Sequence, residues 1–241
     1  MQWTDEGIVL GVRRYGETSV ILELMTGQRG RHLGLVRGGA GKALRAVVQP
    51  GNEVDAVWRA RLEHQLGTFA VEPLRLRAAS LIDEAQALHG LAFLGALLRL
   101  LPERDPYGDI YEMARAIANA LAARLVAPAL FAHFEIALLR ALGFGLDLEA
   151  CVLTGAREDL AYVSPKSGRA VSREAGAPWS ARLLPYPAFL QEDVAASSPD
   201  AQELAAAFRL TGHFLHRDVF APRGVPMPSA RESYLKAVAA L

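Results

Sequence analysis

The residues of this sequence best suited to chemistry are cations that could neutralise phosphate groups. No acidic residue occurs between Glu23 and Glu53, yet several Lys and Arg side chains fall in that window together with His32. Clustered cations follow a polynucleotide backbone, whereas an ordinary protein surface mixes both signs of charge. We therefore predict a nucleic-acid-binding face built from Arg13, Arg14, Arg29, Arg31, Arg37, Lys42, Arg45, Arg59 and Arg61.

Flat side chains that stack on bases would complete a single-strand-binding face. Tyr15 lies in a predicted turn beside two of these arginines and is our candidate for stacking. Trp58 and Phe69 alternate with apolar positions, so we expect both in a core. With few exposed aromatic residues, the predicted affinity depends mainly on phosphate contacts and falls steeply with salt.

The sequence offers no pattern for catalysis, for a cofactor or for a metal. The run from Gly38 to Lys42 lacks the first glycine and the Ser or Thr of a nucleotide-binding phosphate loop, because Val36 and Ala43 stand in those positions. His213 and His216 have helical ligand spacing without a third ligand nearby. We predict a protein that is not an enzyme and that carries neither metal nor cofactor.

Composition restricts the class of protein further. The chain has 26 basic and 26 acidic residues, 51% hydrophobic residues and one cysteine, Cys151. Residues 1–77 carry 11 basic and 8 acidic side chains, a net +3, so the other 164 carry 15 and 18, a net −3. No signal peptide and no long uncharged apolar run is visible, so we expect a cytoplasmic protein with its positive charge at the front and no membrane contact.

Five short β-rich runs separated by glycine-containing turns must position the front cations. The longest connection falls between the third and fourth runs and includes a short helix at 42–48, which is the outline of an OB-fold barrel. Alternation places Ile8, Leu10 and Val12 in the core from the first strand. Pro73 should end the last strand or mark an edge. The predicted strands are 7–13, 18–25, 31–37, 52–61 and 66–71.

After Arg77 the periodicity becomes helical, with a capping box expected at Ser229–Glu232 for the last helix. The irregular stretch after residue 145 is expected to form an inserted loop or small hairpin. We therefore predict an α+β protein with an OB-fold domain at 1–78 and a helical domain at 79–241, of which 147–186 is an irregular insertion. The predicted helices are 80–101, 108–126, 128–142, 198–219 and 229–241.

The order of several degenerate motifs resembles the RecO family of recombination mediators over nearly the whole chain. The front carries Arg14-Tyr15-Gly16-Glu17-Thr18-Ser19, then Leu35-Val36-Arg37-Gly38-Gly39-Ala40, then Gln49-Pro50-Gly51. Further on come Leu142-Gly143-Phe144 and Pro228-Ser229-Ala230-Arg231. The specificity lies in the order of these pieces.

That resemblance implies an amino-terminal OB-fold on a helical domain and a bacterial cytoplasmic protein associated with the nucleoid. It implies binding of single- and double-stranded DNA, annealing of complementary strands, and work with RecR in the RecFOR pathway of DNA-damage repair. It also implies recognition of the carboxy-terminal tail of single-stranded-DNA-binding protein (SSB) and indirect assistance to RecA. For that acidic tail, Arg124 and Arg140 on apolar helices are the candidate cations.

Some members of the family hold zinc with four cysteines after the Leu-Gly-Phe motif. Here Cys151 remains, while Thr154, Ser172 and Ala175 stand where the other thiolates would be. One thiolate cannot satisfy tetrahedral zinc. We predict a degenerate zinc-finger-like module that folds as a metal-free hairpin over 151–175.

Two other functions fit the same residues. An OB-fold RNA-binding factor would use the same cations without annealing DNA. A protein adaptor would use only the helical part, with the barrel as a structural element, and would show no salt-sensitive binding of nucleic acid.

Overall fold

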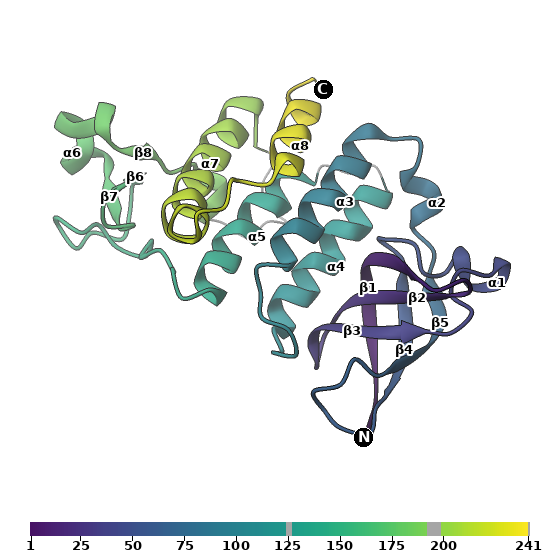
Figure 1. Ribbon diagram of the computed structural model, residues 1–241. Helices are drawn as coiled ribbons and strands as arrows, with labels where there is room; N and C mark the ends of the chain where they lie inside the picture. Colours follow the sequence, from purple (N-terminus) through teal and green to yellow (C-terminus); the bar gives the residue numbers. More distant parts are fainter. Residues whose placement is uncertain (124–126, 192–198, 241) are drawn as a thin grey trace. The chain divides into compact units, whose positions relative to one another are not determined.

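The computed structural model of the chain describes residues 1–123, 127–191 and 199–240 (Figure 1). Two units can be distinguished, one made of residues 1–126 with 228–241 and the other of residues 127–227. The predicted boundary at residue 78 falls within the first unit, because the helices that follow it pack with the strands. Among the described residues, every helix is too short or too polar to cross a bilayer.

The strands at the front close into a barrel in the order β1-β2-β3-β5-β4. All neighbours are antiparallel except β3 and β5, which meet in parallel at Leu35 and Thr68. The five predicted strands are confirmed, and the short helix α1 (Lys42–Arg45) lies in the long connection where it was expected. The strands are β1 Gln2–Tyr15, β2 Ser19–Thr26, β3 Gly30–Val36, β4 Glu53–Arg59 and β5 Thr68–Arg75.

The face of β1 that enters the barrel core differs from the predicted one. Val9, rather than Ile8 or Leu10, belongs to the core cluster, and Val12 is 38% exposed. The register of β1 against β2 shifts between Val9 and Gly11, so simple alternation fails along this strand. Ile8 and Leu10 are nevertheless buried.

Trp58 and Phe69 are core residues, as predicted. Pro73 lies within β5 rather than at its end, because the strand runs on to Arg75. β5 pairs with β3 only at Thr68, so Pro73 faces β4 on one side and has no β3 partner on the other. Its missing N–H therefore costs no ladder hydrogen bond on that free side.

Helices of the same unit cover the barrel and each other. The single helix predicted over 80–101 is in fact two, α2 (Ala78–Leu81) and α3 (Ala85–Leu98). Gly108–Ala122 forms α4, and Ser229–Ala239 forms α8, which packs on α3 with the Phe93 and Tyr234 rings 5.7 Å apart. The predicted capping box of α8 is wrong, since Pro228 is its N-cap and no side chain caps it.

A buried ion pair joins the barrel to the helices that follow it. Arg77, 2% exposed, donates to the Glu53 carboxylate at the start of β4. It also donates to the carbonyl oxygen of Gly51 at 3.3 Å and to Asn119 of α4 at 2.8 Å. One side chain thus ties the strand, the turn before it and a helix together.

The second unit contains helices and a small sheet. α5 (Pro128–Ala141) contacts α7 (Ala201–Phe214), which has a complete capping box between Asp200 and Glu203. Between them, β6 (Leu160–Val163) pairs with both β7 (Ala170–Ser172) and β8 (Leu184–Pro185), so the predicted hairpin is present and this part is not purely helical. The other helical turns among the described residues of this unit are α6 Arg173–Gly176, 3₁₀ segments at Ala177–Arg182, Ala188–Gln191 and Ala221–Arg223, and a π-helix at Leu215–Phe220.

Candidate nucleic-acid interface

Several predicted cations meet at the end of the barrel where β1 stops and β2 begins. The register pairs Arg14 with Val20 and Val20 with Val36, so the end of β1 and the end of β3 lie at the same height on the barrel. Arg37 follows β3 directly. We call this surface the cationic end and define it by Arg13, Arg14, Arg37, Lys42 and Arg45.

The loop after β3 brings α1 to this end. Gly38 has a φ of +69°, a conformation that glycine adopts without strain. The amide of Ala40 then donates to the Thr18 carbonyl at 2.9 Å, which holds the loop against the β1–β2 turn. As a result, Arg14 and Arg45 line one hollow of about 150 Å³.

The two arginines at the end of β1 face opposite ways. Arg14 lies opposite Val20, whose side chain points into the barrel, and Arg13 lies opposite Ile21 on the outer face. Tyr15 is 57% exposed at the strand's last position. Its ring is therefore accessible at the end of β1, as a stacking residue needs to be.

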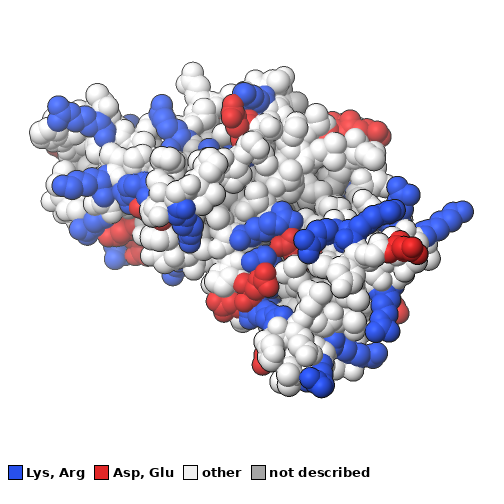
Figure 2. All heavy atoms as spheres, in the orientation of Figure 1, with Lys and Arg blue, Asp and Glu red and all other residues white. Residues whose placement is uncertain are grey.

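Charge at the cationic end is not neutralised within the described residues, where no ion pair involves any of its five cations. All five side chains are exposed. Figure 2 shows blue side chains gathering over the barrel near α1, with a few acidic side chains between them. A phosphate that binds at this surface would replace water around these cations. No existing ion pair would have to break.

Three predicted cations lie at the other end of the barrel. Arg59 pairs in register with Gln2 at the start of β1 and donates to its side-chain oxygen at 2.9 Å. Arg61 follows in the next loop, and Arg29 lies in the β2–β3 turn. The predicted set therefore forms two groups rather than one continuous stripe.

Arg31 belongs to neither group, because its charge is already balanced. It forms ion pairs with Glu23 at 3.0 Å and Glu103 at 3.4 Å. It also donates to the Leu101 carbonyl at 3.3 Å. Its contacts connect β3 to the loop after α3, which is a structural role.

Sequence reasoning did not single out Trp3 or Arg104, and it took His32 only as a neighbour of cations. These three residues surround a hollow beside Arg29. Trp3 alternates with Val9 along β1, and that alternation was the one available signal for it. Arg104 comes from a loop far along the chain, and its neighbours in sequence do not point to the barrel.

One of the two candidate cations for an acidic tail lies within the described residues. Arg140 is exposed in the last turn of α5. Arg124 lies outside the described residues. The predicted tail site stays a prediction.

At Cys151, the neighbouring residue Ser172 forms a hydrogen bond to the sulfur, where a zinc site would have a second thiolate. The Ser172 hydroxyl donates to the buried Cys151 sulfur at 3.4 Å. Burial raises the pKa of this thiol, but hydrogen bonds from Ser172 and Thr154 outweigh that effect and lower it to about 6. In the described parts of the chain, no three His, Cys, Asp or Glu side chains come together as a metal site.

Comparison with protein families matches the chain in two consecutive pieces. Residues 1–77 match the family described as "Recombination protein O N terminal", and residues 84–225 match "Recombination protein O C terminal". The first match ends within two residues of β5, whose last residue is Arg75.

Curated relatives are similar over nearly their whole length. A protein of Methylocella silvestris named "DNA repair protein RecO" is 58% identical over 235 residues, covering 98% of this chain and 95% of the relative. Proteins of the same name from Rhizobium etli and Chelativorans sp. are each 57% identical, and cover 98% and 99% of this chain and 92% and 96% of those relatives.

Proposed function

Because the chain belongs to the RecO family, whose members serve DNA repair and recombination, we propose that it binds single- and double-stranded DNA and anneals complementary strands. We propose the barrel as an OB-fold whose cationic end makes the phosphate contacts. The protein would act without bond chemistry, as a mediator rather than an enzyme.

The observation that carries this proposal is the set of unpaired cations at the cationic end. Arg14, Arg37, Lys42 and Arg45 come from three separate elements and converge without a carboxylate partner in the described residues. Stability alone would favour mixed charges there, since like charges repel. Binding of a polyanion explains why they are kept together.

Annealing follows from charge neutralisation. Two complementary strands repel through their phosphates, and a surface that neutralises phosphates on both strands lowers that repulsion. Base pairing then supplies the free energy, and no bond is made or broken by the protein. Tyr15 would hold a base of one strand by stacking while pairing begins.

The partners are proposed from family membership rather than from a contact in this chain. We propose that it acts with RecR, recognises the tail of SSB and so helps RecA load on coated single strands, in the cytoplasm near the nucleoid. The hairpin β6–β7, with Cys151 against Ser172, is proposed as the remnant of a zinc module that folds without metal.

The test compares two variants that remove the same number of charges. One carries Arg14→Ala, Arg37→Ala, Lys42→Ala and Arg45→Ala. The matched control carries Arg157→Ala, Lys166→Ala, Arg182→Ala and Arg209→Ala, all exposed cations of the second unit. Fluorescence anisotropy with labelled single strands over a range of salt, followed by an annealing assay, gives the readout.

We expect the first variant to bind more weakly and to anneal more slowly than the control. Its plot of log affinity against log salt should be shallower by roughly 0.7 for each phosphate that is no longer neutralised, or about 3 if each of the four cations binds one phosphate. Unchanged annealing by the first variant would mean that the cationic end is not needed for annealing. Equal preference for RNA without annealing would favour the RNA-binding factor, and no binding at all would favour the adaptor.

A further inference from the structure

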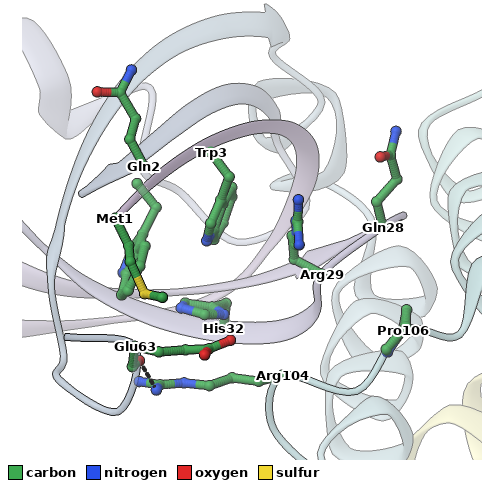
Figure 3. A pocket seen from close by; sticks show the side chains of 10 residues that line it. Met1, Gln2, Trp3, Gln28, Arg29, His32, Glu63, Arg104 and Pro106 are labelled. Carbon is green, nitrogen blue, oxygen red and sulfur yellow. Dashed lines mark hydrogen bonds between the residues drawn. The ribbon is translucent and has the colours of Figure 1, made fainter. Parts of the chain in front are cut away.

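A hollow of about 350 Å³ opens at the barrel end opposite the cationic end (Figure 3). It is lined from β1, the β2–β3 turn, β3, β4, the β4–β5 loop with Glu63, and the loop after α3. Its volume lies near the lower limit of small-ligand pockets, roughly 300–1,000 Å³. The hollow therefore has room for one planar ring system and the group attached to it.

Aromatic rings form the walls of this hollow. The partly exposed Trp3 ring stacks on the buried Trp58 ring with centroids 5.7 Å apart and planes 16° apart. The Trp58 indole donates to the Leu66 carbonyl at 3.0 Å, so this stack is fixed in place. Rigid flat surfaces of this kind bind other flat rings well, because little freedom is lost on binding.

His32 lies between these rings and carries unused hydrogen-bonding groups. Its centroid lies 5.0 Å from that of Trp3 and 4.9 Å from that of Trp58, in edge-to-face contacts. The residue is only 4% exposed, yet neither ring nitrogen has a hydrogen-bond partner within the described residues. Buried polar atoms are nearly always satisfied, so two unsatisfied atoms on one side chain point to an occupant. Both nitrogens are shielded from solvent, so a side chain of the lining must shift for that occupant to reach them.

The protonation state of His32 suits the edge of a base. Burial, together with the positive charges of Arg104 and Arg29, lowers its pKa to about 4. The ring is therefore neutral near pH 7, with one nitrogen donating and the other accepting. Nucleobases present the same mixture of donors and acceptors along their edges.

Two arginines, Arg29 and Arg104, and one carboxylate, Glu63, line the hollow, so its charged side chains sum to +1. Arg104 is held by the carbonyls of Glu63 and Gln65, with its guanidinium 6.0 Å from the centroid of the Trp58 ring. Arg29 is exposed and forms no ion pair with a described residue. Figure 3 shows Arg29 beside Trp3 and Arg104 on the other side of His32. A phosphate attached to the occupant would meet the free guanidinium of Arg29.

We infer that this hollow binds one unpaired nucleobase of single-stranded DNA, with its ring against Trp3, its edge on His32 and its phosphate beside Arg29. The inference rests on the proposed DNA binding but names a second contact, distinct from the cationic end. The five cations of the cationic end contact phosphates, whereas the hollow requires a base that is free of its complement. It would give the protein a preference for single strands over duplex.

The experiment uses the tryptophans as reporters. Trp179 is 55% exposed in the second unit, so Trp179→Phe leaves Trp3 and Trp58 as the only indoles, both at the hollow. The probes are an oligodeoxythymidylate and an abasic oligomer with the same number of phosphates. We expect quenching of the fluorescence by the first oligomer and much less by the second, with weaker binding of the abasic oligomer by anisotropy.

Variants then assign the contact. Trp3→Ala should weaken binding of the base-bearing oligomer roughly 5- to 150-fold, the effect typical of removing one stacked base, without changing the salt slope. Trp179→Ala, which removes an indole elsewhere, should change neither. His32→Phe keeps the packing volume while removing the edge contact, and Trp3→Phe keeps a ring, so these variants report on the hollow even if Trp3→Ala folds poorly.

The outcomes separate this inference from the proposed function. Salt-sensitive binding that is equal for both oligomers, with no quenching, overturns the base pocket and leaves the cationic end intact. No binding of either oligomer overturns both. A base-dependent signal that persists unchanged in both Trp3→Phe and His32→Phe also overturns the inference, because the base would then be bound elsewhere.

Discussion

His32 shows how a single residue can be costly to the fold and useful to the site. It lies among Trp3, Trp58 and Phe69, and its nitrogens gain no hydrogen bond from the described residues. A phenylalanine would fill the same space without unsatisfied polar atoms. The histidine therefore lowers stability in the free protein, and a bound base would offset part of that cost.

The same residue makes stability depend on pH. Its pKa is about 4 in the folded protein and 6.5 when exposed, so the unfolded chain binds the extra proton between these values. Stability should be highest above pH 6.5 and fall towards pH 4, by up to about 3 kcal/mol. Urea unfolding at several pH values should show this decrease in the wild type and not in His32→Phe. An exposed-site control, His64→Phe, should behave as the wild type does.

At the scale of elements, the β2–β3 turn is held by a close backbone approach. Gly30 has a φ of +64°, and a Cβ on it would lie 1.9 Å from the Asp105 carbonyl oxygen. Gly16, in the β1–β2 turn, has a φ of +65° and nothing within 4 Å of a Cβ. The two glycines thus share a conformation and differ only in their surroundings.

That difference predicts unequal effects of alanine. Gly16→Ala should cost about 1 kcal/mol of unfolding free energy, from backbone conformation alone. Gly30→Ala adds a clash with backbone that cannot move freely, and should cost roughly 2–5 kcal/mol. Chemical denaturation of both variants measures the difference. Equal costs would mean that the loop around Asp105 does not pack on the turn.

The elements themselves were largely predictable, because each is encoded locally. The five strands, the glycine turns between them, the short helix α1 and the core positions of Trp58 and Phe69 were predicted correctly from neighbouring residues. The errors arose where another structural feature overrode the local sequence rule. The register shift beyond Val9 changed the core face of β1, and Ser229 matched a capping pattern although Pro228 became the N-cap.

At the scale of the whole first unit, the Arg77–Glu53 pair connects the barrel to its helices. Removing Arg77 leaves the buried Glu53 carboxylate with only the more distant Arg115, 3.8 Å away, as a cationic partner, and breaking a buried pair typically costs about 3–5 kcal/mol. Arg77→Ala should therefore lower the unfolding free energy by that amount. Arg77→Met combined with Glu53→Gln should lower it less, because neither charge remains. Thermal denaturation of the two variants tests this ordering.

The candidate base pocket could not be predicted at any smaller scale. Trp3 and Trp58 become neighbours only because β1 pairs with β4, and His32 joins them only when the barrel closes. Arg104 reaches the same hollow from a loop between α3 and α4. The charge pattern could predict a cationic surface, since it required only composition along the chain, but not which cations would meet.

The order in which the first unit is assembled follows from where α8 lies. Tyr234 covers Phe93 of α3, yet the ribosome makes residues 228–241 only after it has made all of residues 127–227. A nascent chain can close its barrel early. The surface of α3 that α8 covers, however, stays exposed to solvent until the whole second unit has been translated. A chain truncated before α8 would expose the apolar surface of α3 beside a folded barrel. Chaperones bind exposed apolar surface of this kind.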